Sequence, residues 1–114
     1  MRVVKSDTEI DIMRRAGVIA SEAMRVGIEA IDEGVSQAEL AALILAQQAR
    51  AVPGSEGDYP AIMPMLPIGE GADTPHLTWT GKPLVRNEGV SIELAGVYRR
   101  YHAPLARTVA LGTP

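Results

Sequence analysis

The first residues that could take part in catalysis or binding lie in a predicted loop. His76 and the only tryptophan of the chain, Trp79, fall in segment 69–81, whose Gly and Pro residues predict irregular structure. Loops carry binding and catalytic residues more often than helices and strands do. A histidine placed there can accept and release a proton near neutral pH. The other interpretation is that His76 is an exposed or structurally hydrogen-bonded residue.

Glu93 is the second residue of interest. It lies in a run, 90–95, in which apolar and polar residues alternate, and this period of two is typical of a strand with one buried face. A carboxylate beside apolar residues is costly to bury unless it has a partner. Glu93 is therefore either a functional group or a residue of the exposed strand face, and the strand pattern leaves both open.

Several classes of function are excluded by what the sequence lacks. It has no Ser/His/Asp order, phosphate-binding loop, dinucleotide fingerprint or zinc-binding spacing, and no cysteine for disulfide or thiolate chemistry. The formal net charge is −3 and no run of Lys or Arg exceeds two residues. Nucleic acid and anionic membranes are therefore not expected partners. No stretch has the apolar length of a signal peptide or a membrane span, so we expect a cytoplasmic location.

Two capping-box sequences predict where helices begin. In Ser6–Glu9 and again in Ser36–Glu39, a serine at the N-cap is followed three residues later by a glutamate. Apolar residues then recur at steps of three and four, which predicts helices over about 7–32 and 37–51. Two glycines inside the first predicted helix lower its stability, and they would be tolerated where the helix lies close against a sheet.

The length of 114 residues allows one domain with one core, so we treat 1–114 as a single domain. The stretch 52–71 is dense in Pro and Gly. Within it, residues 61–66 form either a short strand that prolines confine to a sheet edge or an irregular loop. Their apolar side chains indicate that this stretch is packed rather than a linker.

The end of the chain predicts an antiparallel hairpin with strands near 90–97 and 102–111. A turn centred on Arg99 would place Glu93 roughly opposite Pro104, within about 5 Å at Cβ. The predicted fold class is α+β, with two helices packed on one face of a small, mostly antiparallel sheet.

Taken in order, these pieces resemble the creatinase/aminopeptidase superfamily, the M24 or "pita-bread" group. The resemblance rests on a Lys-Ser-x-x-Glu-Ile start of the first helix, a Gly-Val-Ser-x-x-Glu-Leu turn into the second, a Pro-His loop, and a hairpin ending Tyr-His-x-x-x-x-Arg-Thr-Val-x-x-Gly. It covers almost the whole chain. Residues 73–80 and 92–108 look most like the ectoine hydrolase branch, which is close to creatinase.

The resemblance implies that His76 is the catalytic residue and that Glu93 and Trp79 bind the substrate. In the family's metallopeptidases each hairpin strand gives one aspartate to a two-metal site, but Glu93 and Pro104 stand at those positions here. Proline has no side-chain donor, so we expect no bound metal and no other cofactor. Creatinase is similar in hydrolysing a C–N bond without metal, through a histidine that moves a proton between water and substrate. Glu93 would then hold a cationic or amide N–H part of a small-molecule substrate.

The resemblance also implies that the chain corresponds to the N-terminal half of a pita-bread catalytic domain. Three hypotheses stay open: a metal-independent hydrolase of a small C–N substrate such as ectoine, a degenerate Xaa-Pro type metallopeptidase, and a non-catalytic half-domain that self-associates. We expect the isolated chain to lack activity. We also expect it to form a homodimer, or to be poorly soluble, through an open hairpin face with Val90, Ile92, Leu94 and Leu105.

Overall fold

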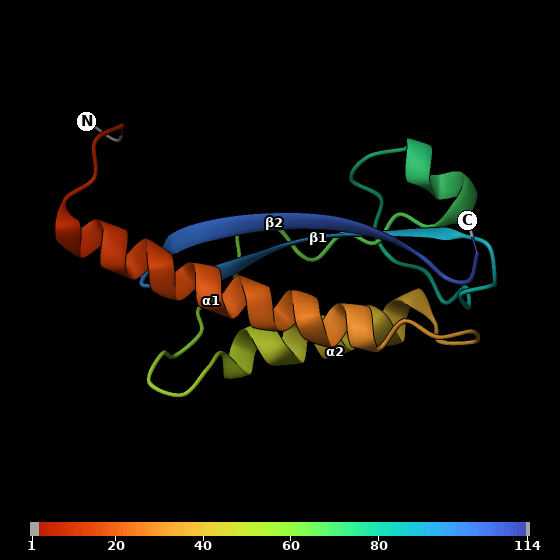
Figure 1. Ribbon diagram of the computed structural model, residues 1–114, viewed down its shortest axis with the longest axis horizontal. Helices are drawn as coiled ribbons and strands as arrows, with labels where there is room; N and C mark the ends of the chain where they lie inside the picture. Colours follow the sequence, from red (N-terminus) through yellow and green to blue (C-terminus); the bar gives the residue numbers. More distant parts are fainter. Residues whose placement is uncertain (1–2, 114) are drawn as a thin grey trace.

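The structure is a computed structural model that describes residues 3–113. In chain order its elements are α1 (Asp7–Glu29), α2 (Gln37–Arg50), the short 3₁₀ helix η1 (Gly69–Asp73), β1 (Gly89–Tyr98) and β2 (Tyr101–Ala110). α1 packs along the β1–β2 hairpin and α2 lies beside α1, while η1 lies at one end of the molecule (Figure 1). The predicted α+β class, with two helices on an antiparallel sheet, is confirmed.

Both helices begin at the predicted residues because local side chains cap them. The Glu9 N–H donates to Ser6 Oγ at 3.3 Å, and the Ser6 N–H donates back to the Glu9 carboxylate at 2.8 Å. Ser36 and Glu39 repeat this arrangement at 3.1 and 3.0 Å. Each box satisfies two backbone N–H groups that a helix start leaves without partners. The predicted helix ends, 32 and 51, overshoot α1 by three residues and α2 by one.

The predicted antiparallel hairpin is present as β1 and β2, but the predicted register between the two strands is wrong. Arg99 and Arg100 both adopt positive φ, 47° and 70°, and together they form a two-residue turn that pairs Tyr98 with Tyr101. The tight turn places Glu93 opposite Ala106, and Pro104 opposite Ala95. Because this shift amounts to two residues, the side chains keep their faces. Glu93 and Pro104 are therefore diagonal neighbours on the same face of the hairpin.

The opposite face of β1 forms the core, as its alternation predicts. Val90, Ile92 and Leu94 are 0%, 1% and 4% exposed, and they pack against residues of α1 and α2. Leu105 of β2 is partly buried against the same cluster. The expectation that these four residues form an open apolar face is wrong, because the chain's own helices cover them. Self-association through the hairpin stays a prediction, without this face as its cause.

α1 lies close against the hairpin at a glycine of β1. A Cβ built on Gly96 of β1 would lie 2.1 Å from the carbonyl O of Ala16 and 2.3 Å from the backbone N of Ala20. At Gly27 a Cβ would lie 3.0 Å from the Ile44 side chain of α2 and 3.2 Å from the Ile92 side chain of β1, whereas at Gly17 it would meet nothing within 4 Å. The expected reason for glycine in α1 therefore holds at Gly27 and is wrong at Gly17.

β1 is paired on both of its edges. On the side away from β2, Met65 and Glu93 exchange two backbone hydrogen bonds of 2.9 and 3.0 Å, and the Ser91 N–H donates to the Pro67 carbonyl. The short edge strand expected over 61–66 is thus reduced to isolated pairing at Met65 and, beyond that range, at Ile68. Within residues 3–113, no helix is long and apolar enough to cross a membrane.

Candidate functional site

Glu93 lies on the hairpin face turned away from α1, in a small pocket. The pocket has a volume of about 170 Å³, and Glu93 is the only acidic residue among its lining residues. The neighbouring walls come from Met63, Met65 and Pro104, and one end is formed by His102. We call it the Glu93 pocket. A single carboxylate among mostly apolar side chains is an arrangement that orients a ligand through one polar contact.

His76 lies in an adjoining pocket of about 300 Å³, together with Trp79. We call it the His76 pocket. The His76 backbone has φ of 64°, in the left-handed region that few non-glycine residues adopt. Such conformations are costly and are concentrated at functional sites. His76 and Trp79, two of the three predicted site residues, thus lie in one pocket, and Glu93 lies in the other.

The two pockets share a wall. Ile62, Met63 and Met65 line both of them, so Glu93 stands on one side of this wall and His76 on the other. Residues 61–65, which we call the wall segment, are tied to the hairpin at Met65 by the two hydrogen bonds to Glu93. A ligand that reached both predicted residues would have to lie across this wall.

A buried glutamine that the sequence did not single out positions the Trp79 loop. Gln37, at the start of α2, accepts hydrogen bonds at its Oε1 from the Thr80 N–H at 2.8 Å and the Thr80 hydroxyl at 2.6 Å. Its Nε2 donates to the carbonyl of Leu66 at 2.8 Å. Gln37 thus joins α2, the Trp79 loop and the chain beside β1. A polar residue at the first position of a helix gives no sign of such a role.

His102 is the other residue that sequence reasoning missed. It is half-buried, it lines the Glu93 pocket, and both of its ring nitrogens lie within hydrogen-bond distance of backbone groups. Its motif in the sequence, Tyr-His before Pro104, indicated only the family and not a task for the imidazole.

The side chains present do not fit a dinuclear metal site. The two hairpin positions that give aspartates in the family's metallopeptidases hold Glu93, which can donate oxygen atoms, and Pro104, which cannot. Among residues 3–113, no three His, Cys, Asp or Glu side chains are grouped closely enough to hold a metal ion. Two divalent cations need bridging carboxylates to offset their charge, and this hairpin supplies one carboxylate.

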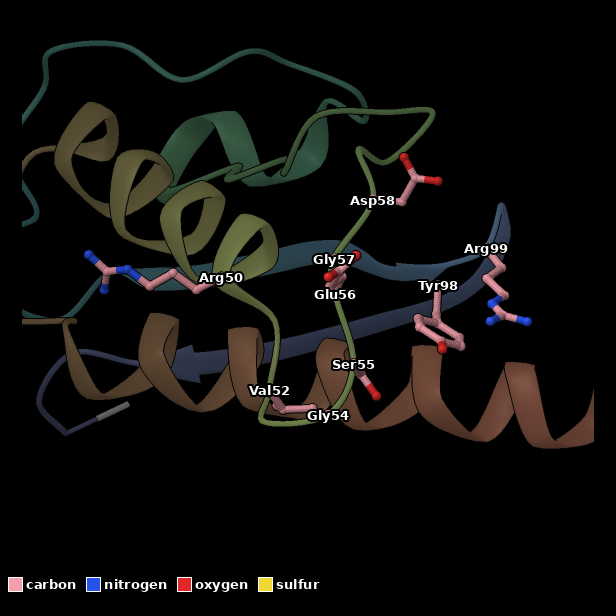
Figure 2. Close-up of a pocket in the computed structure, with 9 residues that line it drawn as sticks. All are labelled: Arg50, Val52, Gly54, Ser55, Glu56, Gly57, Asp58, Tyr98 and Arg99. Atoms are coloured by element: carbon pink, nitrogen blue, oxygen red, sulfur yellow. The ribbon is translucent and has the colours of Figure 1, made fainter.

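A more spacious pocket lies elsewhere and contains none of the predicted site residues. It measures about 750 Å³ and lies between the end of α2, the loop after it and the hairpin tip. Figure 2 shows that its charged groups diverge, because Arg50 extends away from Tyr98 and Arg99. Its Asp58 is already paired with Arg100 at 3.3 Å. A site needs polar groups that converge on a ligand, so we do not assign function to this pocket.

Known proteins resemble the chain throughout its length. The sequence model of metallopeptidase family M24 matches residues 11–114. The ectoine hydrolase of Halomonas elongata is 44% identical over 99% of this chain and 30% of its own length. The Xaa-Pro dipeptidase of Pyrococcus horikoshii is 32% identical over 100% of this chain and 31% of its own length.

The structural comparison agrees with the sequence comparison. The prolidase from Pyrococcus furiosus matches with a TM-score of 0.89 and 30% identity, over 99% of this chain and 32% of that protein. The chain therefore spans about a third of the length of these relatives. Because the family's sequence model and the fold agree over the same residues, the chain belongs to metallopeptidase family M24.

Proposed function

We propose that the chain is part of a hydrolase that cleaves a C–N bond of a small substrate, such as the cyclic amidine ectoine, without a metal ion. The observation that carries the proposal is the pair of adjoining pockets. One presents a lone carboxylate, Glu93, among apolar side chains, and the other presents His76 beside Trp79. The resemblance to an ectoine hydrolase supports the same class of substrate.

Glu93 has the properties of a group that holds a cationic or N–H-bearing part of a substrate. Its neighbours Met63, Met65 and Pro104 can contact the apolar body of a compact ring, and its carboxylate can accept from the ring's N–H groups. A carboxylate among mostly apolar side chains loses hydrating water when a ligand binds. A positively charged group on the ligand replaces that water and so offsets the cost of removing it.

His76 would move the proton that hydrolysis requires. The neutral imidazole accepts a proton from water while the water oxygen bonds to the electrophilic carbon. The C–N bond then breaks, the nitrogen leaves with the electron pair, and the imidazolium returns the proton to it. Water is thereby added across the bond and His76 ends in its starting state. Trp79 is one of the apolar residues that line the His76 pocket.

The test is steady-state kinetics on the intact protein with ectoine as substrate. We expect His76→Ala to lower kcat by about 10²–10⁴-fold, the usual effect of removing a general acid–base group. Glu93→Gln keeps the shape and removes the charge, so we expect it mainly to raise KM. Glu56→Gln, an exposed carboxylate outside both pockets, is the control. Full activity of His76→Ala would mean that His76 is structural.

A second candidate is an Xaa-Pro type peptidase that keeps one metal ion. It is favoured by the close match to the prolidase fold and by the carboxylate that Glu93 still offers at a ligand position of the family. Metal analysis of the purified intact protein separates the candidates. If one ligand has merely been lost, Pro104→Asp should raise the affinity for Co, Mn or Zn. If metal plays no part, the substitution should leave metal content unchanged.

A further inference from the structure

His102 has a ring whose two nitrogens are held by opposite kinds of group. Its Nε2 lies 3.0 Å from the backbone N of Ala61, and its Nδ1 lies 3.1 Å from the carbonyl O of Arg100. A backbone N–H can only donate and a carbonyl can only accept. The ring must therefore carry its hydrogen on Nδ1 and its lone pair on Nε2. These contacts select one neutral tautomer, since the other tautomer and the imidazolium each lose the bond from Ala61.

The bond from Ala61 is one of two anchors of the wall segment. At the other end, Met65 is joined to Glu93 by two backbone hydrogen bonds. Between these anchors, Ile62 and Met63 make no hydrogen bond to any described residue, and they are 60% and 51% exposed. Residues 61–63 are exposed and, among the described residues, are hydrogen-bonded only at Ala61, so this part of the wall segment opens at low free energy when that bond is removed.

The chain just before the wall segment is held independently. The Asp58 N–H donates to the Val97 carbonyl at 3.2 Å, and the Asp58 carboxylate lies 3.3 Å from the Arg100 guanidinium. That guanidinium also lies 4.4 Å from the centre of the Tyr59 ring. A hydrogen bond with Tyr59 and the charge of Asp58 raise the pKa of Arg100. Loss of the His102 contact would therefore release residues 61–63 without releasing residues 58–59.

We propose that His102 is a positioning residue that fixes the wall between the Glu93 and His76 pockets. Its Nε2 holds Ala61, and Ala61 in turn places Ile62 and Met63, which line both pockets. The functional meaning rests on the proposed hydrolase site, but the structural statement does not. The Glu93 pocket, at about 170 Å³, is small enough that displacement of one methionine changes its shape.

The first test needs no substitution. Nitrogen NMR of the imidazoles in the intact, selectively labelled protein distinguishes a protonated from an unprotonated ring nitrogen. We expect His102 to show hydrogen on Nδ1 and a hydrogen-bonded lone pair on Nε2. A signal from the tautomer with hydrogen on Nε2, or from two tautomers in exchange, would overturn the proposal whatever the activity of the protein.

The second test uses three substitutions that separate the two bonds. His102→Gln places an amide oxygen near the position of Nε2 and can still accept from Ala61. His102→Asn reaches only as far as Nδ1, and His102→Leu retains apolar bulk with neither group. Loss of one neutral hydrogen bond should speed amide hydrogen exchange at Ala61 about fivefold. We expect this in Asn and Leu, with Gln close to the unsubstituted protein.

Kinetics then distinguish positioning from chemistry. With ectoine as substrate, His102→Leu should raise KM by about fivefold with a smaller change in kcat, whereas His76→Ala should act on kcat. Equal exchange rates in the Leu variant and the unsubstituted protein, or a Gln variant that behaves as Leu does, would refute the positioning role. If no turnover exists at all, the proposed function fails while the exchange and tautomer results still decide the role of His102. If the Leu variant does not fold, the Asn variant and the tautomer measurement decide it.

Discussion

Gly96→Ala should destabilise the protein severely, because the added methyl group would enter the backbone of α1. The new Cβ would lie 2.1 Å from the Ala16 carbonyl O, 2.3 Å from the Ala20 N and 3.0 Å from the Ala20 Cα. Ordinary contact between such atoms needs about 3.5 Å. α1 would therefore have to withdraw from β1 by about 1.4 Å, the difference between the first distance and this value.

The magnitude follows from what that movement undoes. A radial gap of about 0.5–1 Å forfeits roughly a quarter to a half of the dispersion energy of each contact. The face of α1 that packs on the hairpin includes Ala16, Ala20, Ala23 and Met24, all buried. Overpacked cores lose about 1–3 kcal/mol and occasionally more. We expect at least about 3 kcal/mol here, since backbone atoms cannot turn aside as a side chain can.

Urea unfolding followed by circular dichroism provides the assay. For a small domain with a slope of about 1–3 kcal/mol/M, that loss lowers the midpoint by about 1 M or more. Gly89→Ala is the matched control in the same strand, because its Cβ would meet nothing within 4 Å. Gly17→Ala, in α1, should stabilise the protein by up to about 1 kcal/mol. Equal midpoints for the Gly96 and Gly89 variants would refute the close approach of α1 and β1.

Three further predictions concern pH, a buried amide and assembly. Hydrogen bonds from Tyr101 and from Ser6 lower the pKa of Glu9 to about 2. The stability that the Glu9 carboxylate contributes is therefore present above its unfolded pKa near 4.5 and is lost as pH falls towards 2. Tyr101→Phe should raise the pKa of Glu9, which carboxyl NMR can measure. Gln37→Leu should cost about 2–4 kcal/mol, since it leaves the Leu66 carbonyl and the Thr80 N–H without partners, and fluorescence of the single tryptophan should report a loosened loop. Sedimentation equilibrium should show a dimer at micromolar concentration, and a monomer with well-dispersed amide signals would contradict self-association.

The parts of the fold that follow from neighbouring residues could be predicted from the sequence. A serine and a glutamate three residues apart are enough to start a helix, so both starts were right. The register was not predictable in this way. Two-residue turns with positive φ usually reveal themselves by Asn or Gly, whereas this one is built from Arg99 and Arg100. Nothing in the type of these residues signals a left-handed conformation.

The same distinction applies to the candidate site. Alternation along β1 correctly placed Glu93 on the face opposite the core, and proximity in the chain put His76 and Trp79 in one pocket. The tasks of Gln37 and His102 depend on partners 29–43 residues away in the chain. Such contacts are set by how the elements pack, and no local pattern in the sequence contains them.

Pro104 has a consequence for the outer edge of the sheet as well as for metal binding. Tyr98 and Tyr101 close the hairpin, so in the alternating antiparallel pattern the backbone of Pro104 is directed away from β1. Within residues 3–113, β2 has no strand partner on that side. A proline there removes an N–H from the middle of a ten-residue edge, which hinders another strand from adding to it in register. Pro104→Asp would restore that N–H together with a carboxylate, so a gain in metal affinity should be measured alongside the tendency of the variant to aggregate.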